Sequence, residues 1–133
     1  MSKVALDTNI IIYNHGIVGE TKQIIADKLL DNVPVISTQV ISEYLNVMKR
    51  ISKIEKSELL KICAEWLEDC HIQAVGLSTI KLAHQLVKNY DFQLFDSIIV
   101  ASALEAGCEI LYTEDMQNGQ VIEKKLTIIN PFV

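Results

Sequence analysis

The chain alternates short runs of apolar residues with longer segments in which apolar residues recur at helical spacing. The short runs predict buried strands at residues 4–6, 35–36, 72–75, 110–112 and 126–129. The longer segments predict helices at residues 9–13, 20–31, 38–51, 59–70, 78–87 and 94–106. Strands that alternate with helices favour an α/β fold, with a mainly parallel central sheet and helices on both faces.

Two of the predicted strands run directly into polar and acidic residues. Residues 4–6 are followed by Asp7, and residues 110–112 are followed two positions later by Glu114 and Asp115. Parallel strands place their carboxyl ends at one edge of the sheet, which is where ligands bind in open α/β folds. Asp7 and Asp115 are therefore expected to be neighbours if their strands are adjacent. A simpler interpretation of Asp7, as the cap of the next helix, is equally compatible with the sequence.

Two further acids lie on predicted helices where a carboxylate is costly. Glu43 stands at the edge of the apolar stripe of residues 38–51, and Asp96 shares a helix face with Ile99 and Val100. Capping is again the alternative for Asp96, because it lies near the start of its helix. Several carboxylates gathered in one cleft need protons or a cation. With no thiolate or imidazole among them, they favour Mg²⁺ or Mn²⁺, which assist phosphodiester hydrolysis.

Length, charge and cysteine content limit the classes of protein to which this chain can belong. A length of 133 residues fits one domain, residues 1–133, and no linker-like stretch divides it. No apolar run is long enough to span a membrane and the N-terminus lacks a signal-peptide pattern, so we expect a cytoplasmic protein without membrane contact. A net charge of −5 gives no overall electrostatic attraction for nucleic acid. Three cysteines without a CxxC pair argue against a disulfide framework or a zinc site.

The order of these motifs resembles the PIN domain family, and in particular the stand-alone ribonucleases of VapC type, which are toxins of toxin-antitoxin pairs. The matching stretches are residues 6–9, a Glu in the helix after the second strand, residues 95–103 and residues 111–115. The resemblance covers essentially the whole chain. It implies a parallel sheet in the order 3-2-1-4-5, a divalent-metal ribonuclease site, an antitoxin partner and often a homodimer.

The resemblance also implies roles for individual residues. The positions that match the family's acids are Asp7, Glu43, Asp96 and Asp115. Glu114 competes with Asp115 for the fourth position, and Met116 stands where an aromatic residue often follows. Asn9 and Thr113 match small polar positions that orient an acid or hold a water. In this interpretation Asp7 and Asp96 bind the principal ion, and Glu43 and Asp115 complete the site.

Other functions and other residues remain in competition. A PIN-like module could bind RNA or protein without catalysis, and magnesium-dependent phosphatases and receiver domains are also α/β. A haloacid-dehalogenase-like phosphatase needs a second Asp where this chain has Asn9, however, and a receiver domain needs paired acids after its first strand. The basic run of residues 49–56 either guides an RNA backbone or simply faces water. The helix at residues 59–70, with Trp66, serves a partner contact or the core.

Overall fold

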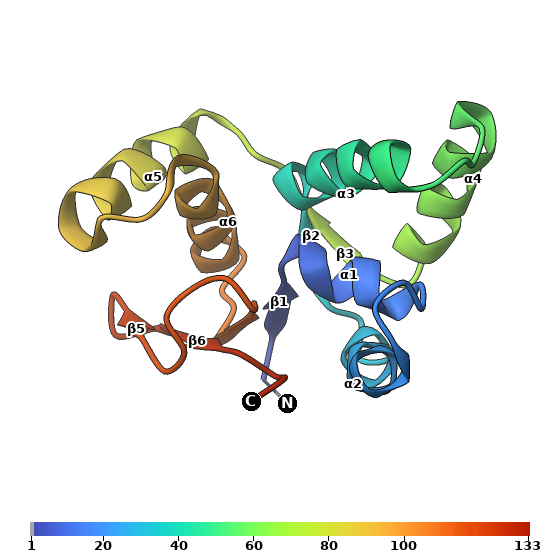
Figure 1. Cartoon of the computed structure of the whole chain (residues 1–133). Helices are drawn as coiled ribbons and strands as arrows, with labels where there is room; N and C mark the ends of the chain where they lie inside the picture. The colour runs from blue at the N-terminus through green and yellow to red at the C-terminus, as the bar shows by residue number, and fades with distance from the viewer. Residues whose placement is uncertain (1) are drawn as a thin grey trace.

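The computed structural model describes residues 2–133 and shows an α/β domain (Figure 1). The strands are β1 (Val4–Leu6), β2 (Val35–Ser37), β3 (His71–Gln73), β4 (Ile110–Tyr112), β5 (Val121–Ile122) and β6 (Leu126–Ile129). The helices are α1 (Thr8–Asn14), α2 (Glu20–Leu30), α3 (Thr38–Ile51), α4 (Lys56–Leu67), α5 (Leu77–Tyr90) and α6 (Leu94–Glu105). Every predicted element is therefore present within one to three residues of its expected bounds.

The strands form one sheet in the order β3-β2-β1-β4-β6-β5. Its first five strands in that order are parallel, as predicted, with Ala5 of β1 level with Val35 of β2 and Leu111 of β4. The expected order 3-2-1-4-5 is wrong at the edge, because β5 is an additional strand that pairs antiparallel with β6. Since β5 has only two residues and Val121 is exposed, it leaves no apolar run in the sequence.

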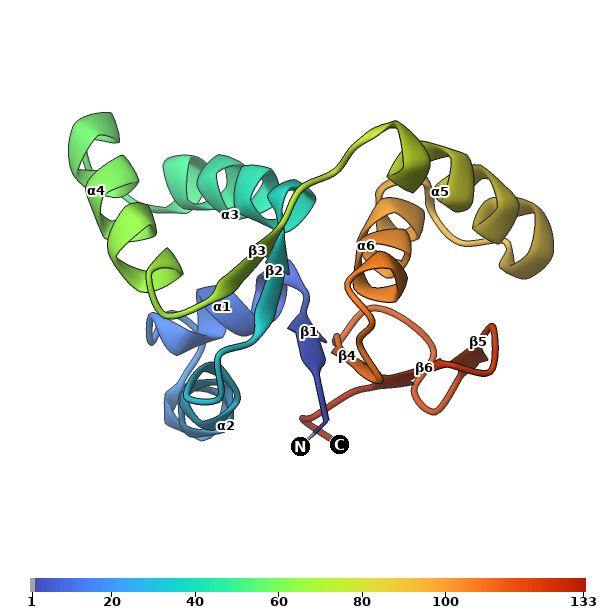
Figure 2. The ribbon, with the colours of Figure 1, turned by 180° about the vertical axis from the view of Figure 1, so that it is seen from behind.

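Two groups of helices flank β1. In one group α1 packs against α2 and α3, and α3 packs against α4. In the other group α5 packs along α6, which lies against β2 and β4. Figures 1 and 2 show the groups on opposite sides of β1, with the two chain ends close together. The residues that follow β1 are thereby placed between both groups.

Local sequence accounts for where the helices begin. Ser37 ends β2 and caps α3, because its Oγ accepts a hydrogen bond from the backbone N–H of Val40 (3.1 Å). For α5 the sequence favours Ser78 as the cap, but this prediction is wrong, because Ser78 lies inside the first turn and Gly76 precedes the helix. The hydroxyl of Thr79 accepts a hydrogen bond from the N–H of Gly76 (3.0 Å), which secures that helix start.

The core is formed by buried side chains of the strands and of all six helices, with the largest shares from α1, α3 and α6. Tyr44 of α3 is fully buried, and Trp66 packs edge-on against it with ring centroids 5.1 Å apart. Trp66 therefore belongs to the packing between α3 and α4. Apolar residues on nearly every face of α6 predict a fully buried helix, but this prediction is wrong at the first turn, where Leu94 and Phe95 are exposed. No helix within residues 2–133 is long and apolar enough to cross a membrane.

Candidate active site

Asp7 lies at the carboxyl end of β1 and is almost completely buried, with 4% of its surface exposed. One carboxylate oxygen accepts a hydrogen bond from the N–H of Thr8 (2.7 Å), so Asp7 caps α1. Its other oxygen accepts a hydrogen bond from the hydroxyl of Thr113 (2.7 Å), at the end of β4. Asp7 therefore caps α1 and also lies at the sheet edge where a ligand could bind, so the two interpretations from the sequence are compatible.

Thr113 joins the ends of β1 and β4. It is fully buried, and its hydroxyl donates to Asp7 while accepting a hydrogen bond from the N–H of Asp115 (3.2 Å). Asn9, in the first turn of α1, donates from its side-chain amide to the carboxylate of Asp115 (2.9 Å). Asn9 and Thr113 therefore each hold an acid in place, which is one of the roles that the resemblance implies.

The remaining two predicted acids approach from helices. Glu43 of α3 is half-buried and accepts hydrogen bonds from the hydroxyl of Thr8 (3.4 Å) and from the amide of Gln39 (3.0 Å). Asp96 is half-buried in the first turn of α6, and α6 packs against α3. The sequence analysis missed Gln39, although its position four residues before Glu43 places both side chains on one helix face.

The pKa values indicate that the four acids share one electrostatic environment. Burial raises the pKa of Asp7 to about 6 against the opposing hydrogen bonds from Thr113 and Thr8, and the charges of Asp96 and Glu43 raise it further. The pKa of Asp96 is also raised, first by burial and then by Asp115 and Glu43. Among residues 2–133, no Lys, Arg or His forms an ion pair with any of these four acids. Their negative charge is therefore uncompensated by the protein.

Glu114, the competing fourth acid, has a different set of partners. It forms an ion pair with Lys22 of α2 and accepts a hydrogen bond from the hydroxyl of Tyr13. Lys22 also lies 4.7 Å from the ring centroid of Tyr13 and 5.2 Å from that of Phe132. Burial raises the pKa of Glu114, but the hydrogen bonds from Lys22 and Tyr13 outweigh burial and lower it. Since Glu114 already has a cation, Asp115 is the acid left to the cluster.

The oxygen atoms of these four acids are suitable ligands for a hard divalent cation. All four acids offer oxygen ligands, and the buried, unpaired Asp7 carboxylate gains most from a nearby positive charge. No three acidic, His or Cys side chains in the described part of the chain lie close enough together to coordinate one ion as they stand.

The histidines lie outside this cluster. His15 is half-buried, with its Nε2 at 2.7 Å from the hydroxyl of Tyr44, and burial lowers its pKa. His71 and His84 are exposed. Cys63 and Cys108 are buried, Cys70 is half-buried, and all three are free thiols.

The fold and the cluster together define a class of protein. It is an open α/β domain in which acids gather beside β1, where the connections change direction from β2 on one side to β4 on the other. A model of the PIN domain matches residues 4–121, and the chain belongs to the PIN domain family. No curated protein matches the sequence.

Solved structures share the fold at low sequence identity. A chain of a toxin-antitoxin complex from Klebsiella pneumoniae aligns with a TM-score of 0.72 at 21% identity, over 98% of each chain. VapC20 of Mycobacterium tuberculosis, described as a sarcin-ricin-loop-cleaving toxin, aligns with a TM-score of 0.68 at 16% identity, over 85% of this chain and 90% of that one. FitAcB from Neisseria gonorrhoeae aligns with a TM-score of 0.71 at 16% identity, over 97% and 98% of the two chains.

Proposed function

We propose that this protein is a divalent-metal-dependent endoribonuclease and the toxin of a type II toxin-antitoxin pair. The observation that carries the proposal is the electrostatic coupling of the buried Asp7 to Asp96 and Glu43, and of Asp96 to Asp115, while no cation among residues 2–133 pairs with these acids. A buried carboxylate among other carboxylates is unfavourable unless a ligand compensates its charge. Membership of the PIN domain family and the fold shared with toxin structures agree with this function.

Each acid has a defined part in the proposed site. Asp7 and Asp96 hold the principal ion, and Glu43 and Asp115 complete its surroundings. A bound Mg²⁺ or Mn²⁺ supplies positive charge, which favours ionisation of water and stabilises the charge that develops on the phosphate. Thr113 fixes the orientation of the Asp7 carboxylate, and Asn9 fixes that of Asp115. With this arrangement the protein needs no nucleophile of its own.

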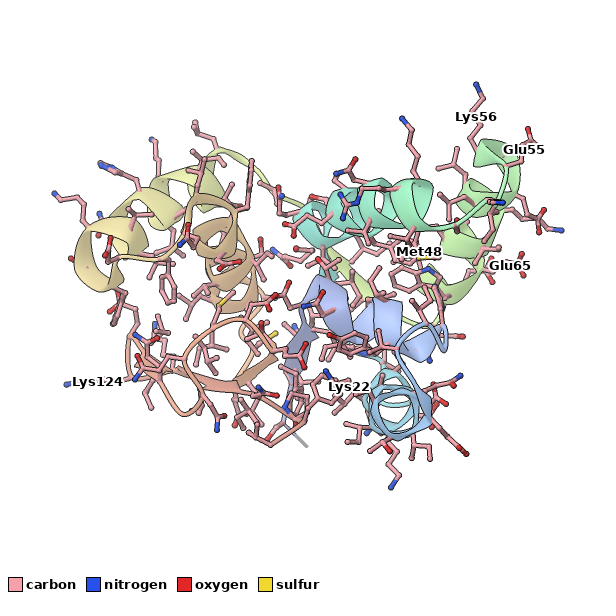
Figure 3. All side chains as sticks on the ribbon, in the orientation of Figure 1. Lys22, Met48, Glu55, Lys56, Glu65 and Lys124 are labelled. Atoms are coloured by element: carbon pink, nitrogen blue, oxygen red, sulfur yellow. The ribbon has the colours of Figure 1, made fainter. Side chains whose placement is uncertain are left out.

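RNA is the proposed substrate. VapC20, which shares the fold, is described as a toxin that cleaves the sarcin-ricin loop. Exposed basic side chains at the end of α3 and the start of α4 offer contacts for the RNA backbone away from the acids, and Figure 3 shows Lys56 pointing outward there. These four residues are Lys49, Arg50, Lys53 and Lys56.

The test is cleavage of a mixed RNA pool by the purified wild type and by the Asp7→Asn and Asp96→Asn variants. The reaction is run with Mg²⁺, with Mn²⁺ and with excess EDTA. We expect cleavage by the wild type only with metal, and its loss in both variants. Glu65→Gln is the matched control, because it removes one exposed carboxylate from α4 and leaves the cluster intact.

Two results would contradict the proposal. Cleavage that survives in either Asp variant would indicate a contaminating nuclease. Metal binding without cleavage of any RNA in the pool would favour the alternative function, a PIN module that binds RNA or protein without catalysis.

We also propose two protein partners, an antitoxin and a second copy of the chain. Leu77, Ile80 and Leu94 are 71%, 47% and 68% exposed, and the last two line a hollow of about 250 Å³ between α5 and α6. Such an apolar surface is costly in water and supports self-association through this face. Sedimentation analysis should give the mass of a dimer for the wild type and of a monomer for Leu77→Glu with Leu94→Glu. A monomeric wild type would contradict the dimer.

A further inference from the structure

A second hollow, of about 500 Å³, lies between α3 and α6 beside the acid cluster. Its walls are formed by one carboxylate, three neutral polar side chains and two apolar side chains: Glu43, Gln39, Ser42, Asn46, Val47 and Phe95. Glu43 belongs to this wall and also raises the pKa of Asp7 and of Asp96 by its charge. Glu43 therefore links the hollow to the acid cluster, and the volume of the hollow lies within the range of ligand pockets.

Phe95 is the most unusual residue of this wall. It stands immediately before Asp96 in the first turn of α6, and 57% of its surface is exposed although residues 99–103 of the same helix are buried. More than half of this aromatic side chain thus remains in contact with water, and its ring face suits stacking against another planar group. Its position next to Asp96 places that stacking surface one residue away from a proposed metal ligand.

The polar part of the wall is neutral apart from Glu43. The side chain of Asn46 makes no hydrogen bond to any described residue of the chain, so its amide is free to donate and to accept. No Lys or Arg lines the hollow, and Glu43 would repel a phosphate. These features suit a planar, uncharged heterocycle with donors and acceptors on its edge.

We propose that this hollow binds one unstacked nucleobase of single-stranded RNA next to the phosphate to be cleaved, with Phe95 stacking on the base and Asn46 bonding to its edge. The inference rests on the proposed ribonuclease function and adds to it a base-binding position formed by Phe95 and Asn46 beside Glu43. Sequence-specific reading of RNA generally uses bases that are splayed out of a helix, stacked on an aromatic ring and hydrogen-bonded along an edge.

The test measures binding separately from cleavage. A set of short RNA oligonucleotides, each with a single 2-aminopurine at a different position, is titrated with protein in Ca²⁺, which oxygen ligands also bind. Stacking on Phe95 should quench the fluorescence strongly at one position only, and gels report whether each oligonucleotide stays intact. Phe95→Ala should abolish that quenching and weaken binding about 10-fold, whereas Phe95→Tyr should retain both.

Ile24→Ala is the matched control, because Ile24 is also an exposed apolar side chain on a helix, α2, but lines neither of the two hollows. Unchanged quenching in Phe95→Ala, or quenching at no position in the wild type, would overturn the inference. Loss of dimer mass in Phe95→Ala would also overturn it, by assigning Phe95 to a protein contact. Absence of metal-dependent cleavage despite position-specific quenching would overturn the proposed nuclease function alone.

Discussion

The two sides of the acid cluster are built differently. On the strand side, Asp7, Thr113, Asp115 and Asn9 form a continuous set of hydrogen bonds across the ends of β1 and β4. On the helix side, Glu43 and Asp96 are half-buried, and Phe95 projects into solvent beside them. The strand side therefore fixes where negative charge is held, while the helix side leaves room for a ligand. Substitutions on one side should therefore have effects that differ from those on the other.

The largest expected effect comes from removing the charge of Asp7 in metal-free protein. The pKa of Asp7 is about 6 in the folded protein and 3.8 as its ordinary value, so the folded protein binds more protons between these values. Stability in EDTA should thus fall as the pH rises from about 4 to about 6. Asp7→Asn should remove this slope and stabilise the protein at pH 7 by at most about 3 kcal/mol, because the hydroxyl of Thr113 loses its acceptor in the variant.

Urea unfolding in EDTA at a series of pH values measures this difference. The amide of the variant keeps an acceptor for the N–H of Thr8, so the cap of α1 is preserved. Glu65→Gln serves as the control and should follow the wild type. Equal pH slopes for the wild type and Asp7→Asn would show that the buried carboxylate carries no strain, and would weaken the case for a charge-compensating ligand.

The second largest effect should come from Thr113→Val, which keeps the shape of a fully buried side chain and removes its hydroxyl. The change leaves Asp7 without one donor and the N–H of Asp115 without its acceptor. Loss of such buried bonds costs about 1–3 kcal/mol of stability. Partners that orient metal ligands are commonly worth about 10- to 100-fold in activity. Thr113→Ser should restore most of both, and equal activity of all three proteins would argue against a positioning role.

A smaller effect is expected from Asn9→Ala, because Asp115 is exposed and water replaces the lost amide. Cleavage should fall by about 10-fold, which is less than in Thr113→Val, because only Asp115 loses a hydrogen bond that fixes its orientation. The unfolding free energy should change by less than about 1 kcal/mol. Asn9→Asp is the sharper companion variant, because a fifth carboxylate beside Asp115 should reduce cleavage further at low metal concentration.

The sequence was sufficient for the elements that follow from one continuous pattern. The buried strands β1, β2, β4 and β6 leave apolar runs, and the order of acids along the chain predicts which side chains meet at their ends. No local pattern could predict that Glu114 is paired while Asp115 is not, because Lys22, the cation that pairs with Glu114, is 92 residues away in the chain. Phe95 was missed for a related reason, since an apolar residue in an apolar helix is assigned to the core by periodicity alone.

The smallest expected effect separates these two adjacent acids. Glu114→Gln removes the ion pair with Lys22, but the partners are 24% and 34% exposed, so solvent already screens the pair. A loss of less than about 1 kcal/mol is expected, with RNA cleavage unchanged. Asp115→Asn removes charge from the cluster and should reduce cleavage strongly with little change in stability. Parallel measurement of thermal unfolding and of metal-dependent cleavage compares them, and the reverse pattern would assign the fourth acid to Glu114.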